Sequence, residues 1–232
     1  QPPELPAPEN LRWYEPSHLQ WSAVEAAEGS YVVELFYAAE ELDDFDGFLN
    51  SRYRPGIPEG FDGMEKLLQR ELQGEFPHEP GADIVYDRDL WDKFDKTGWY
   101  YAFVTPMQYK VTGTETMAYM GQSAGTVFAY ERPAKGLAVP GGLTWSQDEA
   151  GKYWMSWNPL TDTSQEAHYC LEVAYADRDW PLYSISGLSR TKLQAHPYWW
   201  ENHQGYFKFR IKAIVPVSDY EVCGNGAWSE WT

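Results

Sequence analysis

The feature that most constrains the fold of this chain is an internal repeat of short alternating segments. Each copy opens with a segment ending in Leu-x-Trp, continues with one ending in tryptophan, and follows with one that has tyrosine near its start. These segments are 10–13, 18–21 and 30–35 in the first copy and 142–145, 153–157 and 168–173 in the second. Alternation with a period of two places one set of side chains inside a β-sheet. The sequence therefore predicts two β-units in tandem.

A glycine followed by an alternating aromatic segment recurs later in each copy, at 98–104 and 205–211. Short alternating segments separated by Pro, Gly, Asn and Asp are typical of antiparallel β-sandwiches. The turn-rich stretch 132–142 separates the two copies, and 232 residues suit two domains. We therefore expect an all-β chain with domains at 1–133 and 134–232.

The first copy carries a long insertion at about 38–84, between its third strand and its aromatic strand. Apolar residues recur there at helical spacing, and Gly74 stands where a helix would stop. These residues are Phe61, Met64, Leu67, Leu68 and Leu72. The pattern predicts an amphipathic helix over about 60–73, which either packs on its own sandwich as a lid or docks a partner.

The repeat resembles the fibronectin type III family over nearly the whole chain. The positions that carry the resemblance are Trp21 and Trp157, Tyr31 and Tyr169, Tyr100 or Phe207, and Lys212-Ala213. Pro106 replaces the alanine in the first repeat. The resemblance implies two immunoglobulin-like sandwiches, the first with an inserted helix. Tandem copies of this kind resemble modules of secreted bacterial surface proteins, which implies a secreted or cell-surface location.

The chain ends in Trp228-Ser-Glu-Trp231-Thr, which is similar to the Trp-Ser-x-Trp-Ser signature of cytokine receptors. That resemblance implies tryptophans stacked with cations of the neighbouring strand. Three cations alternate with the inward-facing residues of 207–212 and share one outer face: Lys208, Arg210 and Lys212. We predict a structural cation–π ladder here. The paired cysteines expected in a receptor's first domain are missing, which disfavours a receptor.

Two cysteines are present, Cys170 and Cys223. Cys170 lies between two inward-facing residues and should point outward from the sandwich. In this fold the sixth strand runs between the two cysteines. Two strand spacings of about 4.8 Å exceed the roughly 7 Å that a disulfide tolerates between Cα atoms. We predict that the two thiols are not bonded to each other.

The net charge is −17, and most of it lies in the first part of the chain. Such an acidic surface repels phosphate, which makes nucleic acid a poor partner. The acidity favours solubility, a cation site or a basic partner. Carboxylates cluster at 43–47 and again at Asp87, Asp89, Asp92 and Asp95. Leu42 and Tyr53 occupy the first and twelfth positions of an EF-hand at the first cluster and rule that motif out, but calcium stays open as a cofactor.

Motifs for catalysis are missing from the sequence. It has no His-Glu-x-x-His, no Gly-x-Ser-x-Gly and no phosphate-cradling glycine loop. It also has no apolar run of about 18 residues, so no membrane span is expected in this segment. The chain opens at Gln1 in a proline-rich stretch with no visible signal peptide, as expected of a mature or trimmed start. We expect a non-catalytic protein, with an enzyme that has an unrecognised acidic site as the lowest alternative.

Aromatic side chains supply the candidate ligand site. Trp99, Tyr101 and Phe103 alternate outward from the first sandwich, and Phe36 shares their face. Such a band needs a cover: the insertion, the second domain, or a ligand such as a sugar or a protein partner. Trp180 and the pair Trp199-Trp200 raise the same question in the second domain.

These observations favour an extracellular binding or adhesion module with a protein or glycan ligand. The alternative is a spacer or carbohydrate-binding part of a polysaccharide-degrading system.

Overall fold

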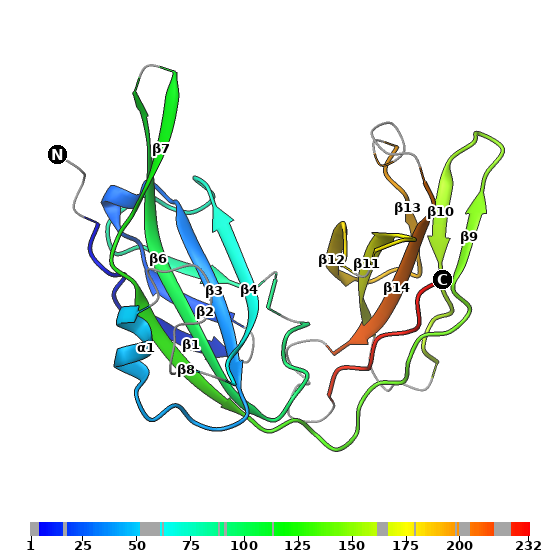
Figure 1. Ribbon diagram of the computed structural model, residues 1–232, viewed down its shortest axis with the longest axis horizontal. Coiled ribbons are helices and arrows are strands. Elements are labelled where there is room, and N and C mark those ends of the chain that lie inside the picture. The colour runs from blue at the N-terminus through cyan, green and yellow to red at the C-terminus, as the bar shows by residue number, and fades with distance from the viewer. Residues whose placement is uncertain are drawn as a thin grey trace. The chain divides into compact units, whose positions relative to one another are not determined.

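The computed structural model describes residues 5–15, 18–51, 61, 63–87, 89–90, 92–112, 114–161, 167–178, 180–197, 199, 205–215 and 224–232. The chain forms two compact units (Figure 1). The first comprises Gln1–Asp87 and Lys96–Glu131, and the second comprises Arg88–Asp95 and Arg132–Thr232. The short segment Arg88–Asp95 therefore belongs to the second unit, although it lies between two strands of the first in sequence.

The first unit consists of two antiparallel sheets. The smaller sheet has the order β1-β2-β5, with β1 at Arg12–Glu15, β2 at His18–Ser22 and β5 at Asp83–Tyr86. The larger sheet has the order β4-β3-β6, with β4 at Glu65–Leu72, β3 at Tyr31–Ala38 and β6 at Gly98–Thr112. Its last two strands, β7 at Glu115–Met120 and β8 at Ala124–Tyr130, pair successively along β6.

The second unit repeats this plan. One sheet has the order β13-β10-β9, with β9 at Thr144–Gln147, β10 at Tyr153–Ser156 and β13 at Lys192–Gln194. The other has the order β12-β11-β14, with β11 at His168–Tyr175, β12 at Tyr183–Leu188 and β14 at Phe207–Ile214. The C-terminal segment runs beside β14 (red in Figure 1) and takes the place of a seventh strand, because the backbone N–H groups of Gly226, Ser229 and Thr232 donate to β14 carbonyls.

Both units thus place strands one, two and five in one sheet and strands four, three, six and seven in the other. This is the strand order of a fibronectin type III-like sandwich, and it confirms the predicted fold class. Sandwiches of this kind often have a tyrosine near the start of the sixth strand whose hydroxyl bonds to the backbone a few residues earlier, and Tyr100 is such a residue in the first unit. The Tyr100 hydroxyl donates to the carbonyl of Lys96 at 2.9 Å, whereas Phe207 has no hydroxyl at its equivalent position.

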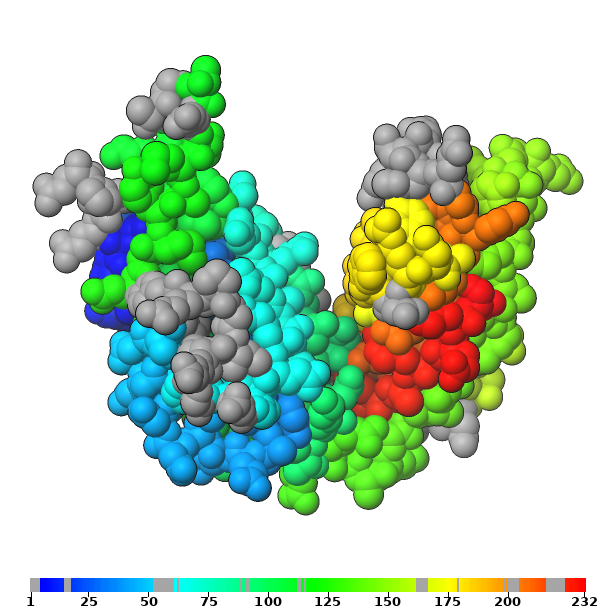
Figure 2. All heavy atoms as spheres, viewed as in Figure 1, coloured from blue at the N-terminus to red at the C-terminus, as the bar shows by residue number. Residues whose placement is uncertain are grey.

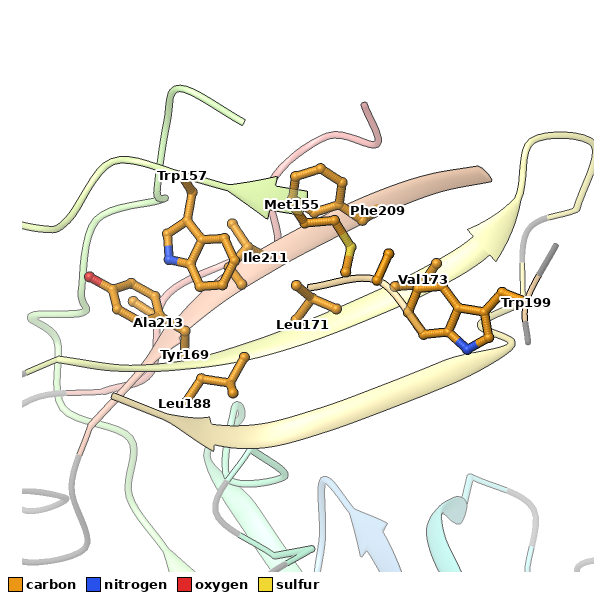
Figure 3. Packing of buried hydrophobic residues seen from close by; sticks show 11 residues of the cluster. Met155, Trp157, Tyr169, Leu171, Val173, Leu188, Trp199, Phe209, Ile211 and Ala213 are labelled. Carbon is orange, nitrogen blue, oxygen red and sulfur yellow. The ribbon is translucent and has the colours of Figure 1, made fainter. Parts of the chain in front are cut away.

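Each core is built from the inward side chains of both sheets. In the second unit, Met155 and Trp157 of the smaller sheet face Leu171, Phe209 and Ile211 of the larger (Figure 3). In the first unit, the buried Trp21 packs edge-on against Tyr31, with ring centres 5.4 Å apart. Alternation brings these residues to one face of each strand, and burial of their apolar surface holds the sheets together.

The helix predicted over 60–73 is wrong. Residues Glu65–Leu72 form β4, which pairs with β3 along its length. The described part of the insertion contains one short helix, α1 at Phe45–Ser51. A 3₁₀ turn, η1 at Glu25–Ala27, precedes β3. The adjacent Leu67 and Leu68 fit the spacing of a helix as well as that of a strand. The edge of β3 offers hydrogen bonds to the backbone of 65–72, and this partner cannot be seen from the spacing of apolar residues. No helix among the described residues is long and apolar enough to cross a membrane.

Candidate binding surface

The insertion of the first unit covers the aromatic band that the sequence offered as a ligand site. Phe36, Tyr101 and Phe103 are buried, and Trp99 is half-buried against the same cluster. Their cover comes from α1 and its flanks, which lie at the surface (light blue in Figure 2). Phe45 stacks on Tyr101 and Phe103 at 5.8 and 5.7 Å between ring centres. These four residues and the insertion form a second core, so the insertion is the cover that the structure shows among the three that the sequence left open.

An acidic pocket of about 550 Å³ borders this second core. Its lining combines Leu42, Phe61 and Met64 with carboxylates of the stretch 40–44. One of these carboxylates has a local role, because Asp44 accepts a hydrogen bond from the backbone N–H of Gly47 at 2.8 Å inside α1. Among the described residues, no three His, Cys, Asp or Glu side chains gather in a way that could hold a metal ion.

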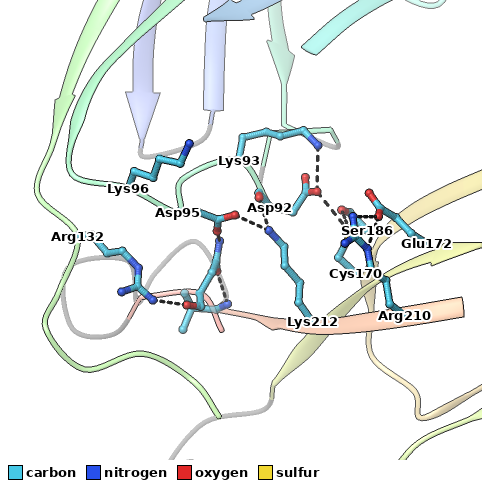
Figure 4. Close-up of polar contacts among 12 residues, drawn as sticks. Asp92, Lys93, Asp95, Lys96, Arg132, Cys170, Glu172, Ser186, Arg210 and Lys212 are labelled. Atoms are coloured by element: carbon cyan, nitrogen blue, oxygen red, sulfur yellow. Dashed lines mark hydrogen bonds and ion pairs between the residues drawn. The ribbon is translucent and has the colours of Figure 1, made fainter. Parts of the chain in front are cut away.

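The carboxylates of the second acidic cluster, at 87–95, contact different side chains of this chain. Asp87 lies 3.2 Å from Nε2 of His18 in the first unit. In the second unit, Asp92 forms an ion pair with Lys93 at 3.0 Å, and Asp95 forms one with Lys212 at 2.7 Å (Figure 4). These carboxylates therefore do not converge on one point where a cation would bind.

Burial shapes the chemistry of this polar network. The Lys212 ammonium is buried and also donates to the backbone carbonyl of Asp92 at 2.6 Å. Burial by itself would raise the pKa of Asp92, but the cations of Lys93 and Lys212 outweigh it and hold that pKa below its usual value. Burial would likewise lower the pKa of Lys93, yet the charge of Asp92 raises it. The network is an internal, mutually neutralised ion cluster.

Cys170 lies in the same network. Its neighbours Tyr169 and Leu171 belong to the sandwich core and Cys170 does not, as alternation predicts. The Cys170 side chain points outward from the core as expected, but it is buried. Its thiol donates to Asp92 at 3.4 Å and accepts from the Ser186 hydroxyl at 3.3 Å. Burial raises the pKa of Cys170 to about 12, which suppresses the nucleophilic thiolate. Cys170 is a free thiol, and Cys223 lies outside the described residues.

The structure brings the five predicted ladder residues together in one alternating stack. The Arg210 guanidinium carbon lies 4.6 Å from the ring centres of both Trp228 and Trp231. The Lys212 ammonium lies 5.2 Å from Trp228 on one side, and the Lys208 ammonium lies 5.0 Å from Trp231 on the other. The order along the stack is therefore Lys212, Trp228, Arg210, Trp231, Lys208.

Backbone and side-chain hydrogen bonds fix the tryptophans of the ladder. The Ser229 N–H donates to the Ile211 carbonyl at 2.9 Å, and the Ser229 hydroxyl accepts from the Ile211 N–H at 3.0 Å. Arg210 is held from the opposite side by Glu172 of β11, with 2.6 Å between the ion-paired atoms. The ladder thus joins the C-terminal segment to β14 and β11.

A different group of aromatic and cationic side chains is exposed at the β11–β12 turn of the second unit. We call it the Arg178 surface; the β11–β12 region lies at the surface in Figure 2 (yellow). It comprises the exposed Arg178, Trp180, Leu182 and Tyr206 together with the half-buried Tyr175. The Arg178 guanidinium carbon lies 5.0 Å from the ring centre of Tyr175 and 5.3 Å from that of Trp180. Trp180 is 62% exposed and Tyr206 is 86% exposed.

Buried rings support the Arg178 surface from below. Tyr175 packs on Phe207 with ring centres 5.2 Å apart, and Phe207 packs on Trp199 at 6.2 Å. The backbone of Tyr206 is tied to the turn, because its carbonyl accepts the N–H of Ala176 at 2.8 Å. The exposed rings therefore project from a packed base.

The sequence singled out two of these positions without resolving them. The sequence left open whether Trp180 and Trp199 are covered by the protein or by a ligand. In the structure Trp180 is exposed, whereas Trp199 is buried in the core. Trp200 lies outside the described residues. Arg178 was missed altogether, although an arginine two residues before Trp180-Pro181 in a turn is a local signal that could have marked it.

Comparisons with known proteins add little to this picture. No protein-family model matches the sequence, and no curated protein matches it. Among solved structures, the chain is similar to the FN1–FN3 domains of chicken CNTN1, with 11% identity, a TM-score of 0.31, and coverage of 100% of this chain and 67% of that chain. It is also similar to a cytokine receptor complex, with 10% identity, a TM-score of 0.33, and coverage of 95% and 99%. At these values neither similarity bears on what this chain binds.

Proposed function

We propose that this protein is a non-catalytic binding or adhesion module of an extracellular or cell-surface protein, with a glycan or protein ligand. The observation that carries the proposal is the Arg178 surface. Tryptophan, tyrosine and arginine are the residue types that dominate the energetics of binding sites. Here Arg178 and Trp180 are exposed at one turn, and the exposed Tyr206 is bonded through its backbone to Ala176 of the same turn. Contiguous exposed apolar side chains mark interaction sites more often than scattered ones do.

The state of the titratable groups supports binding over catalysis. Asp92, Lys93 and Cys170 have shifted pKa values, but they lie in a buried cluster. Asp92 and Lys93 balance each other's charge there, and the Cys170 thiol stays protonated. Asp148, whose pKa is lowered chiefly by a hydrogen bond from the Trp154 indole, sits at an exposed hairpin turn. A catalytic acid or base needs a substrate within reach of an unengaged group, and these groups are engaged by the protein.

The main rival is a passive spacer, such as a linking unit of a polysaccharide-degrading system. A spacer needs folded sandwiches and has no use for exposed aromatic side chains. The ladder, the second core and the buried ion cluster would serve a spacer equally well. The Arg178 surface is therefore where the two functions lead to different expectations.

An array experiment separates these functions. The purified chain is applied to immobilised glycans and extracellular proteins beside a Trp180→Ala/Tyr206→Ala double variant. We expect at least one ligand that the chain binds and the double variant does not. Retention of every ligand by the double variant would refute the role of this surface, and a complete lack of ligands would favour the spacer. Release of chromophore from nitrophenyl glycosides would reveal an enzyme instead.

A further inference from the structure

We propose that the Arg178 surface recognises a glycan through a sugar unit that carries a carboxylate. This inference rests on the proposed binding function and names the ligand class of the same surface. Two features carry it: an arginine that forms no ion pair with any described residue, and the exposed ring of Trp180 beside it.

Arg178 differs in its pairing from Arg210 and Lys212, two other cations of the second unit. Arg210 is paired with Glu172, and Lys212 with Asp95. Within the described residues, Arg178 contacts two ring faces and forms no ion pair.

Stacking prepares Arg178 for an external carboxylate. A guanidinium has five N–H donors in a rigid plane, arranged to bind the two oxygens of a carboxylate together. Contacts to Tyr175 and Trp180 hold the group in place without using a charged acceptor. An arginine restrained in this way loses less side-chain entropy when it binds than a freely moving one.

The rings beside Arg178 suit a pyranose. Trp180 is 62% exposed, so its contact with the guanidinium leaves much of the ring open. Tyr206, whose backbone carbonyl accepts the N–H of Ala176, is 86% exposed. The C–H face of a sugar stacks on such a ring and buries apolar area on both partners, without requiring a pocket. A carboxylated sugar supplies the ring contact and the anion in one rigid unit, whereas an acidic peptide would supply them from separate flexible side chains.

Charge limits the length of ligand that fits. Residues 133–232 contain 8 basic and 11 acidic side chains, against 10 and 24 in residues 1–132. Repulsion by exposed charges decays over about 8 Å at physiological ionic strength. The exposed Asp177 precedes Arg178 in the chain and repels any anion there, so an oligosaccharide with one carboxylate meets less repulsion than a long polyanion. The surface is therefore suited to a terminal or isolated carboxylated unit.

The test titrates the full-length chain with trigalacturonate, dialginate, a hyaluronan tetrasaccharide and sialyllactose, each beside a neutral oligosaccharide of the same size. Binding is followed by tryptophan fluorescence and calorimetry. We expect at least one carboxylated sugar to bind roughly tenfold more tightly than its neutral counterpart, the lower range for a charge-assisted contact. Arg178→Gln should abolish that difference, and Arg178→Lys should restore only part of it.

Two further variants separate ring stacking from general surface effects. Trp180→Ala should weaken carboxylated and neutral sugars alike. Trp154→Ala is the matched control, because Trp154 also contacts a cation, with the Lys192 ammonium 4.5 Å from its ring centre, but its indole N–H is engaged by Asp148. It should leave binding unchanged. Near-ultraviolet circular dichroism checks that each variant keeps its fold.

Each remaining outcome has a defined meaning. Equal affinity for carboxylated and neutral sugars, or a preference that survives Arg178→Gln, overturns the proposal. Competition by a Glu-rich peptide at the same concentration as the sugar also overturns it and assigns the surface to a protein partner. A neutral glycan or a protein found on the arrays that requires Trp180 would leave the binding function standing while this inference fails. A lack of any ligand would remove both.

Discussion

Arg210→Ala tests whether the C-terminal ladder stabilises the second unit. The substitution removes the only cation of the stack that touches two rings, each 4.6 Å from its guanidinium carbon. It also removes the partner of Glu172, in a pair whose side chains are 27% and 15% exposed. The structure therefore predicts a larger loss than for an ordinary surface arginine.

The expected magnitude follows from these contacts. Each partly exposed cation–π contact contributes about 0.5–1 kcal/mol, and leaving a mostly buried carboxylate unpaired costs about 1 kcal/mol or more. The free energy of unfolding should fall by about 2–3 kcal/mol. Lys208→Ala removes one ring contact of the stack, at 5.0 Å, and should cost less than Arg210→Ala, since a partly exposed cation–π contact contributes about 0.5–1 kcal/mol. Arg210→Lys should fall between the two, because it keeps the charge and loses the planar stacking.

Cys170 provides a local reporter for this measurement, because its buried thiol reacts only when the second unit opens. In a Cys223→Ser background, Arg210→Ala should accelerate thiol labelling by about 30- to 150-fold, which corresponds to 2–3 kcal/mol. The urea midpoint of the near-ultraviolet signal provides an independent readout. A variant with the same labelling rate and midpoint as Lys208→Ala would refute the structural role of the ladder.

Three further predictions follow from the buried residues. Phe48→Ala should destabilise the first unit by about 3–5 kcal/mol in chemical denaturation, because the buried ring packs 5.1 Å from Phe36; a loss below 1 kcal/mol would contradict the second core. The raised pKa of Cys170 means that its contribution to stability is complete below pH 9 and is lost as pH rises toward 12; a Cys170→Ser variant should lack this loss in urea titrations. The lowered pKa of Asp92 has the opposite sign, so its contribution is present above the ordinary carboxyl pKa and is lost on acidification; Asp92→Asn should flatten the acid limb of the stability profile.

The segment Arg88–Asp95 changes the expectation for the isolated second domain. A fragment that begins at residue 142 lacks Asp92 and Asp95, the partners of Cys170 and Lys212. We expect this fragment to fold with reduced stability and to expose Cys170 to rapid thiol labelling, whereas the full chain protects it. Equal protection in both would show that the segment does not cover the thiol in solution. The domain boundaries at 133 and 134 remain a prediction that this experiment also examines.

The sequence by itself determined the features that depend on neighbours along the chain. Alternation fixes which side chains of a strand face inward, so the two sandwiches followed from the repeat, and the ladder cations followed from their positions between Phe207, Phe209 and Ile211. Alternation also placed Cys170 outside the sandwich core, although it could not show that the thiol is covered.

Tertiary structure decided the features that depend on distant partners. Leucines at 67 and 68 suit a helix as well as a strand, and the free edge of β3 made the choice. The aromatic band was covered by α1, and Cys170 by a residue 78 positions earlier in the chain. Arg178 acquired its role from Tyr175 and Trp180, whose rings meet it only because the β11–β12 turn folds back. Periodicity shows which face a side chain occupies, and the packing of remote segments decides what covers that face.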